Sequence, residues 1–236
     1  MSEHNRRSAL ITGASRGFGR AIAEALAHEG WDLIIDARGA EALDATRDAL
    51  TQTSRVIAIA GDIGDAHHRD ALAEAAREIG GLDAIINNAG TLGTSPLPPL
   101  LEYSIDELRD VFVINTIAPL ALLQQLRDTL RDNATVINVT SDAAVEAYPG
   151  WGGYGASKAA LEAITRVLAA ENPSLRVYAL DPGDMRTTMH QDAFPGEDIS
   201  DRPEPELSVP AVIALLNSDA PSGRYRASEV ASEAHA

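Results

Sequence analysis

Tyr154 and Lys158 have types and a spacing that suggest chemistry. They belong to the segment Tyr154-Gly155-Ala156-Ser157-Lys158, which opens a stretch with a helical pattern. Residues four apart lie on the same face of a helix, so the two head groups can serve one site. A free tyrosine has a pKa of about 10, too high for an efficient base at neutral pH, but a neighbouring ammonium favours the phenolate. The pair indicates proton transfer by Tyr154, although an amphipathic surface can carry the same spacing.

Two further polar residues strengthen the interpretation that Tyr154 transfers a proton. Ser141 directly follows the apolar run Thr135–Thr140, at the carboxyl end of an expected parallel strand, where open sheets bind ligands. Its hydroxyl can hydrogen-bond a reacting oxygen and stabilise charge that develops there. Asn115 interrupts an apolar helical stretch with an amide that needs partners if buried. Taken alone, Asn115 is equally compatible with a simple bend in a helix.

The elements that would position these residues alternate regularly along the chain. Short apolar runs are typical of strands buried on both faces, and the alanine-rich stretches between them have a helical pattern. We therefore predict an α/β, doubly wound Rossmann fold: a predominantly parallel sheet of about seven strands, flanked by helices on both faces. The predicted strands are Ser8–Thr12, Asp32–Ala37, Val56–Ala60, Asp83–Asn87, Thr135–Thr140, Arg176–Leu180 and Gly223–Arg226.

Two other segments carry specific structural expectations. Ser104 and Glu107 have the spacing of a capping box, which predicts a long helix from about Asp106 towards Arg131. Pro119 cannot donate the interior hydrogen bond, so we expect a kink there. We expect one domain over residues 1–236, with a Pro- and Gly-containing substrate loop at about 184–206 and a disordered polar tail at 227–236.

A glycine-rich turn follows the first expected strand. It reads Thr12-Gly13-Ala14-Ser15-Arg16-Gly17-Phe18-Gly19 and leads directly into a helical pattern. Glycines let a backbone approach a pyrophosphate closely, and a helix N-terminus offers free N–H groups to phosphate. The turn therefore predicts a dinucleotide site, with the spacing G-x-x-x-G-x-G.

Together these segments resemble the short-chain dehydrogenase/reductase family over nearly the whole chain. Asn115, Ser141, Tyr154 and Lys158 match the catalytic tetrad of that family in order and spacing. The resemblance implies an NAD(P)-dependent oxidoreductase that reduces a carbonyl or oxidises the matching alcohol. Tyr154 would exchange the proton and Ser141 would orient the oxygen, while Lys158 would also hold the nicotinamide ribose and would relay protons with Asn115.

The same resemblance implies further cofactor contacts. Met185 stands where the family usually has Val or Ile, and we expect its contact to be through the backbone. The implied contacts outside Tyr154 and Lys158 are Gly13, Ser15, Arg16, Gly17, Phe18, Gly19, Arg38, Asp62, Ile63, Asn88, Ala89, Gly90, Pro182, Gly183, Met185 and Thr187.

The end of the second strand bears on the choice of cofactor. An acidic residue there usually bonds the ribose hydroxyls of NAD, whereas arginine accommodates the phosphate of NADP. Asp36 falls one residue before the usual position of the carboxylate, which Ala37 occupies, while Arg38 stands where NADP-dependent members often have arginine. Arg16 can reach the same phosphate, so we favour NADP(H) over NAD(H). The alternative is that Arg38 is a solvated surface residue and Asp36 caps a turn.

Composition narrows the possible partners. With 35 acidic and 19 basic residues the net charge is -16, which argues against binding to nucleic acid or an anionic membrane. The chain has no cysteine, and its N-terminal apolar run is too short for a signal peptide, so we expect a cytoplasmic protein. We expect no metal site, because His67-His68 lacks a spaced third ligand and is interpreted as a surface pair.

The identity of the substrate is less constrained. We expect a small-molecule carbonyl or alcohol between apolar and aromatic walls formed by Val145, Tyr148, Trp151, Met189, His190 and Phe194. Asp142 and Asp184 either line that site or cap turns. By analogy with the family we also expect a homo-oligomer, a dimer or a tetramer. The rival function is a non-catalytic, NAD(P)-sensing regulatory protein, and a sugar-nucleotide epimerase is disfavoured by chain length.

Overall fold

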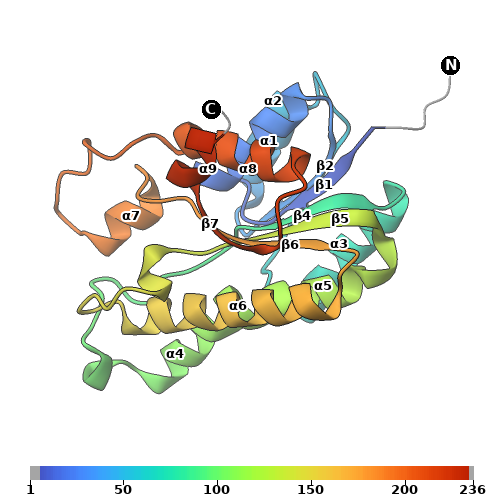
Figure 1. The fold of residues 1–236 in the computed structure, drawn as a ribbon. Coiled ribbons are helices and arrows are strands. Elements are labelled where there is room, and N and C mark those ends of the chain that lie inside the picture. The colour runs from blue at the N-terminus through green and yellow to red at the C-terminus, as the bar shows by residue number, and fades with distance from the viewer. Residues whose placement is uncertain (1–5, 234–236) are drawn as a thin grey trace, which may run out of the picture.

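The computed structural model describes residues 6–233, with side chains up to Val230, and contains a seven-stranded sheet (Figure 1). The strand order is β3-β2-β1-β4-β5-β6-β7, and all neighbouring strands are parallel. This confirms the predicted doubly wound fold. The strands are β1 (Ser8–Ile11), β2 (Asp32–Ala37), β3 (Val56–Ala60), β4 (Leu82–Asn87), β5 (Leu130–Val139), β6 (Arg176–Asp181) and β7 (Gly223–Arg226).

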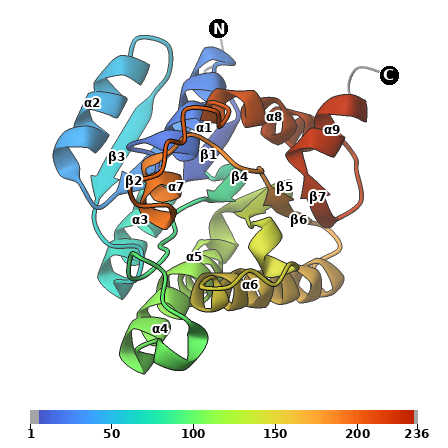
Figure 2. The same ribbon diagram turned by 90° about the vertical axis from the view of Figure 1, so that its left-hand side faces the viewer.

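Helices cover both faces of the sheet and create two separate hydrophobic cores (Figures 1 and 2). One face carries α1 (Gly17–His28), α2 (Ala40–Leu50), α8 (Val209–Asn217) and α9 (Ala227–Glu233). The other carries α3 (Ala66–Glu78), α5 (Ala118–Leu126) and α6 (Gly152–Glu171), with α4 (Ile105–Phe112) beside them. Burial of every strand between two helical layers explains the continuous apolar runs. Within the described residues, no helix is long and apolar enough to cross a membrane.

The prediction of a long helix from Asp106 towards Arg131, kinked at Pro119, is wrong about where the helix is distorted and about where it ends. A π-helical turn at Val113–Ile117 separates α4 from α5, and there the Ala118 N–H donates to the carbonyl of Val113, five residues back. Pro119 lies in the first turn of α5, where its missing N–H costs little, so it does not produce the break. The helix ends at Leu126, because β5 begins at Leu130, five residues before the predicted strand.

The C-terminal segment also differs from the prediction. Residues 227–233 form α9 rather than a disordered tail, while 234–236 lie outside the described residues. Ala227 and Val230 of α9 are buried in the core cluster that α1 and α8 share. The two apolar residues, three positions apart, give this otherwise polar helix a narrow face that packs against the protein.

This packing makes a testable prediction for stability. Val230→Ala should lower the free energy of unfolding by about 1.5 kcal/mol, since two buried methyl-sized groups are lost. Val145→Ala, at a valine that is 54% exposed, should change it by less than about 0.5 kcal/mol. Urea unfolding of both variants measures the difference, and equal effects would contradict the burial of α9 against the core.

Candidate active site

A cleft of about 1080 Å³ lies along the carboxyl edge of the sheet. Most residues predicted to bind cofactor or substrate line it, although they come from segments far apart in the sequence. The predicted residues that line it are Gly13, Ser15, Arg16, Gly17, Phe18, Arg38, Asp62, Ile63, Asn88, Ala89, Gly90, Ser141, Trp151, Tyr154, Lys158, Pro182, Gly183, Met185, Thr187, Met189 and His190. Residues predicted to bind cofactor and residues predicted to bind substrate therefore line one continuous cleft.

The glycine turn at one end of the cleft packs directly on the segment after β4. A Cβ atom on Gly19 would lie 2.4 Å from Nδ2 of Asn88 and 2.5 Å from the carbonyl oxygen of Gly13, so no larger residue fits. Asn88 Nδ2 donates to the carbonyl of Thr12 at 2.9 Å, which ties the two loops together. No side chain caps the start of α1, and its first turn contains no acidic residue. The turn thus leaves backbone donors that suit a phosphate.

Asp36 anchors this turn from beneath. Its Oδ1 accepts the backbone N–H of Gly13 at 2.8 Å, and its Oδ2 lies 2.9 Å from Nε2 of His68. Both side chains are buried, which corrects the prediction that His68 lies on the surface; its neighbour His67 is exposed. Asp36 borders the cleft, but both of its oxygens are engaged within the protein, where they hold the turn. Local sequence patterns do not reveal this pair, because its members are 32 residues apart.

Arg16 and Arg38 stand at the same end of the cleft, one in the glycine turn and one just after β2. Both are exposed, and no ion pair with another described residue is found for either. Two guanidinium groups that lack an internal carboxylate form a local positive field in an acidic protein. This end of the cleft can accept an anionic group.

Tyr154 and Lys158 lie at the opposite end, on the first turns of α6. Both are almost fully buried, with relative exposures of 8% and 3%. The Lys158 Nζ donates to the carbonyl of Val139 at the end of β5 at 2.8 Å, and it lies 5.6 Å from the centre of the Tyr154 ring. The strand end therefore orients the ammonium beside the phenol.

Burial dominates the electrostatics of this pair. It raises the pKa of Tyr154, and the carboxylates of Asp181 and Asp142 raise it further, while a hydrogen bond with Ser141 opposes them. Burial also lowers the pKa of Lys158 to about 8. The sequence-based expectation that Lys158 makes Tyr154 more acidic is thus outweighed by desolvation and by two carboxylates that the sequence did not place. These effects favour the neutral phenol of Tyr154.

Ser141 is held by its neighbour in the chain. Its Oγ donates to Oδ1 of Asp142 at 2.9 Å and accepts the N–H of Ala143 at 3.2 Å, in a short 3-10 helix at Asp142–Ala144. The other carboxylate oxygen of Asp142 accepts the Tyr148 hydroxyl at 2.9 Å. Asp142 therefore both lines the cleft and caps a turn, so its two expected alternatives hold together.

Asn115 is fully buried behind the cleft, in the π-helical turn. Its amide spans two segments: Oδ1 accepts the N–H of Thr91 at 2.8 Å, and Nδ2 donates to the carbonyl of Thr91 at 2.8 Å and to Oγ of Ser157 at 3.0 Å. A Cβ on Gly90 would lie 3.3 Å from Asn115 Oδ1 and 3.6 Å from Lys158 Nζ, so both polar groups border one glycine. The helical distortion thus brings Asn115 close to Lys158.

The substrate end needs a partial correction. Val145, Tyr148 and Phe194 lie outside the lining of the cleft. Both Val145 and Tyr148 are exposed, and the Tyr148 hydroxyl donates to Asp142 at the edge of the cleft. Phe194 instead packs against Trp151 with the two rings tilted, with 5.9 Å between ring centres. Sequence reasoning missed Leu92 and Val111, which line the cleft from the loop after β4 and from α4. Asp184 lines it too, which settles one alternative for that residue.

Comparisons with known proteins agree with this geometry. Residues 7–198 match the short chain dehydrogenase family. Mouse sepiapterin reductase is 34% identical over 197 residues, covering 77% of this chain and 76% of that protein. A structure from Pseudomonas syringae, described as a short chain dehydrogenase, superposes with a TM-score of 0.88 at 27% identity and covers 96% of this chain and 99% of that one. A Shigella flexneri structure complexed with NADP has a TM-score of 0.86 at 30% identity, with 95% and 98% covered.

The buried anchor of the glycine turn is open to a direct test. Asp36→Ala leaves the N–H of Gly13 and the His68 ring without their acceptor, so the free energy of unfolding should fall by about 3 kcal/mol. Asp48→Ala removes an exposed carboxylate on α2 and should change it by less than about 0.5 kcal/mol. Urea unfolding at neutral pH compares the two. Similar stability losses in both variants would show that Asp36 does not anchor the turn.

Proposed function

Because the chain belongs to the short-chain dehydrogenase family, we propose that it is an NADP(H)-dependent oxidoreductase acting on a ketone, an aldehyde or a secondary alcohol. One observation carries this proposal. Tyr154, Lys158 and Ser141 meet at one end of a single cleft whose other end is a glycine turn with two arginines. A protein that only senses the nucleotide has no need of a buried phenol beside a buried ammonium at that end.

The residues at the glycine-turn end of the cleft suit the binding of a dinucleotide. The uncapped start of α1 suits the pyrophosphate, and Arg16 with Arg38 suits a ribose phosphate. Asp62, Ile63, Asn88, Ala89 and Gly90 would hold the adenosine half, while Pro182, Gly183, Met185 and Thr187 would hold the nicotinamide. When bound, the cofactor supplies or accepts the hydride.

The engagement of Asp36 supports the preference for NADP(H). A carboxylate at the end of β2 would repel a ribose phosphate, but this one is turned inward to Gly13 and His68. Ala37 stands at the usual acidic position and leaves Arg38 as the charged group there. The Shigella flexneri relative, which is complexed with NADP, is consistent with this choice.

The electrostatics of Tyr154 suit carbonyl reduction. Reduction adds a hydride to the carbonyl carbon and a proton to its oxygen, and a neutral phenol can give that proton. Ser141 would hold the same oxygen, and Lys158 with Asn115 would return a proton to the phenolate. Alcohol oxidation runs the same transfers in reverse and requires Tyr154 to be deprotonated first, so its rate should rise with pH.

The substrate would lie between Trp151 and the proposed substrate loop at about 184–206, which contributes Met189 and His190. These aromatic and apolar groups suit an uncharged or partly aromatic carbonyl. The similarity to a sepiapterin reductase makes sepiapterin a useful member of any panel of test compounds.

The decisive experiment follows NADPH consumption against a panel of ketones and aldehydes. Wild-type protein should turn over at least one of them, and Tyr154→Phe should reduce kcat by roughly a thousandfold or more, because the proton donor is removed. Calorimetry should show that the variant still binds NADPH. Tyr225→Phe is a matched control, since that hydroxyl donates to the carbonyl of Pro221 outside the cleft, and it should retain most of the activity.

Two outcomes would contradict the proposal in different ways. Full activity of Tyr154→Phe would reject Tyr154 as the proton donor. Tight NADPH binding by the wild type without turnover of any carbonyl or alcohol would instead favour the nucleotide-sensing alternative.

The two arginines give a prediction for cofactor choice. Arg16→Ala and Arg38→Ala should each raise the KM for NADPH by about tenfold or more, because a charge-assisted contact with the ribose phosphate is lost, while the KM for NADH stays nearly constant. Arg20→Ala, on the exposed side of α1 and paired with Glu24, is the matched control. A parallel rise in both KM values would contradict a phosphate contact.

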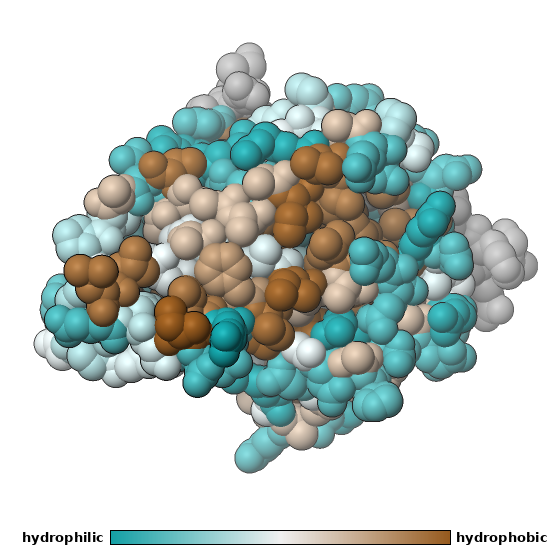
Figure 3. Space-filling view, turned by 90° about the horizontal axis from the view of Figure 1, so that it is seen from below, coloured by the Kyte–Doolittle hydropathy of each residue, from teal (hydrophilic) through white to brown (hydrophobic). Residues whose placement is uncertain are grey.

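A homo-oligomer belongs to the same proposal. Apolar side chains gather on the face formed by α4, α5 and α6 (Figure 3), where Ile105, Ile117 and Val167 are each more than half exposed. Apolar patches of this kind mark interaction surfaces, and we propose that a second copy of the chain covers this one.

Light scattering at working concentration should return a dimer or a tetramer. Ile117→Glu with Val167→Glu should shift it to the monomer, because association would then bury unpaired carboxylates. Leu207→Glu, at an exposed apolar residue on a different face, should leave the assembly intact. A monomeric wild-type protein would reject the proposal outright.

A further inference from the structure

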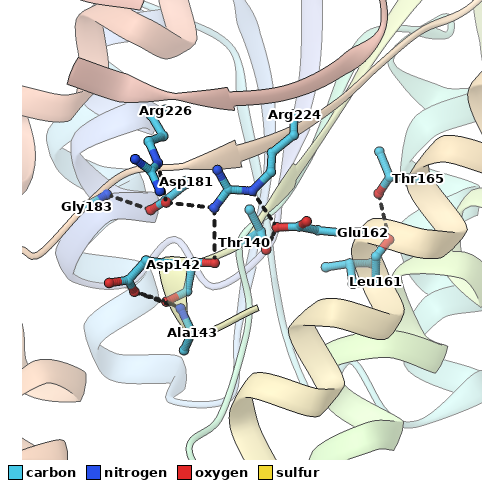
Figure 4. A network of polar contacts seen from close by, with 11 residues as sticks. Thr140, Asp142, Ala143, Leu161, Glu162, Thr165, Asp181, Gly183, Arg224 and Arg226 are labelled. Carbon is cyan, nitrogen blue, oxygen red and sulfur yellow. Dashed lines mark hydrogen bonds and ion pairs between the residues drawn. The ribbon is translucent and has the colours of Figure 1, made fainter. Parts of the chain in front are cut away.

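The edge strand β7 brings an arginine to the back of the candidate active site. Arg224 and Arg226 are two residues apart on this strand, so their side chains leave the same face of the sheet. In the parallel pairing, Arg224 lies beside Ala179 and Arg226 beside Asp181 of β6. Figure 4 shows both guanidinium groups directed at the carboxyl ends of the neighbouring strands. Arg224 extends further, towards α6.

The Arg224 guanidinium joins three separate segments. Its Nε donates to Oε1 of Glu162 on α6 at 2.9 Å, and its Nη2 donates to Oδ2 of Asp181 at 2.9 Å and to the carbonyl oxygen of Ser141 at 3.4 Å (Figure 4). Only the planar fork of an arginine can reach all three acceptors from one strand. The group therefore fixes the end of β5, the end of β6 and the middle of α6 relative to one another.

Both carboxylates are buried and have further partners. Glu162 Oε1 also accepts the Thr140 hydroxyl at 2.7 Å, one residue before Ser141. Asp181 Oδ1 accepts the N–H of Gly183 at 3.1 Å, within the segment proposed to hold the nicotinamide. Arg226 is a more distant partner of Asp181, at 3.8 Å. Arg224 thus contacts Ser141 directly, and it reaches the proposed site also through Asp181, next to Pro182, and through Glu162, which holds Thr140 beside Ser141.

We propose that Arg224 is a positioning residue of the active site, which fixes the backbone at Ser141 and neutralises Asp181 behind Tyr154. The proposal rests on the proposed function, in which Tyr154 transfers the proton. It adds that the charge of a residue on the last strand sets the pH at which that transfer occurs.

The charges around Tyr154 explain why neutralisation matters. Asp181 from β6 and Asp142 from the turn after β5 both disfavour the phenolate, while Lys158 lies on the same helix as the phenol. Glu162, the second carboxylate that Arg224 binds, lies on α6 one turn after Lys158. Without the guanidinium, two buried carboxylates would lose their main counter-charge, and the pKa of Tyr154 would rise further.

The test measures the pH dependence of kcat/KM for alcohol oxidation, which requires the Tyr154 phenolate. Arg224→Gln keeps the size and an amide donor but removes the charge, so the rising limb should move to higher pH by roughly half a unit or more. Arg224→Lys keeps the charge but loses the fork, so kcat should fall while the limb stays close to its wild-type position. A merely structural role would lower kcat equally at every pH and would overturn the proposal.

Arg131→Gln is the matched control. Arg131 pairs with Asp83 at 2.6 Å at the opposite edge of the sheet, and its side chain is 36% exposed against 25% for Arg224. The Arg131→Gln variant should have a lower free energy of unfolding, but the rising limb of its pH profile should stay where it is in the wild type. An equal shift in this variant would also overturn the proposal, since the effect would then be that of any lost ion pair.

A second variant tests the same link without removing Arg224. Asp181→Asn should move the limb to lower pH, and the double variant Asp181→Asn with Arg224→Gln should show a much smaller shift than Arg224→Gln alone. An unmoved limb in Asp181→Asn would refute the electrostatic link, even if Arg224→Gln fails to fold. The proposed function fails separately, if wild-type protein is inactive or if Tyr154→Phe is active.

Discussion

Buried polar groups at the carboxyl edge of the sheet must find partners inside the protein, because water cannot reach them to replace a missing hydrogen bond. Parallel strands bring all their carboxyl ends to this edge, so the constraint falls on one line of residues. Asp36 at the end of β2 is satisfied by Gly13 and His68, and Asp181 at the end of β6 is satisfied by Gly183 and Arg224. These contacts fix the loops that line the cleft.

The same constraint explains how the interior of the sheet connects to α6. Asn87 donates to Asn138 on the next strand at 2.8 Å, and Asn138 donates to Thr165 on the helix at 2.8 Å. One helical turn nearer the cleft, Thr140 donates to Glu162. A ladder of polar contacts therefore holds α6 against β5, and this is the helix that carries Tyr154 and Lys158. Their placement depends on hydrogen bonds made well away from the phenol.

Local patterns predicted most of the fold and most of the cleft. The apolar runs located the strands, and the glycine turn located the start of α1, because each signal lies within a few adjacent residues. The features that sequence reasoning missed depend on contacts between distant segments. The buried His68 contacts Asp36, the amide of Asn115 in the π-helical turn binds Thr91 and Ser157, and Val230 of α9 packs in the core. No periodicity in the chain records these pairings. The pKa of Tyr154 likewise depends on distant groups, since burial raises it most and Asp181, 27 positions away in the sequence, raises it further.

The position of Arg224 in the chain has a consequence for synthesis. A ribosome makes the strands in sequence order, and domains fold from the N-terminal side as they emerge. The glycine turn, Ser141, Tyr154 and Lys158 would all be present in a chain that had not yet reached residue 223, but Asp181 and Glu162 would then lack the cation that joins them. The strand that carries Arg224, β7, lies at an edge of the sheet and is the last one to be synthesised. The order of translation thus makes the ion pairs behind the cleft a late event. In a nascent or truncated chain, Ser141, Tyr154 and Lys158 would lie near carboxylates that Arg224 does not yet neutralise.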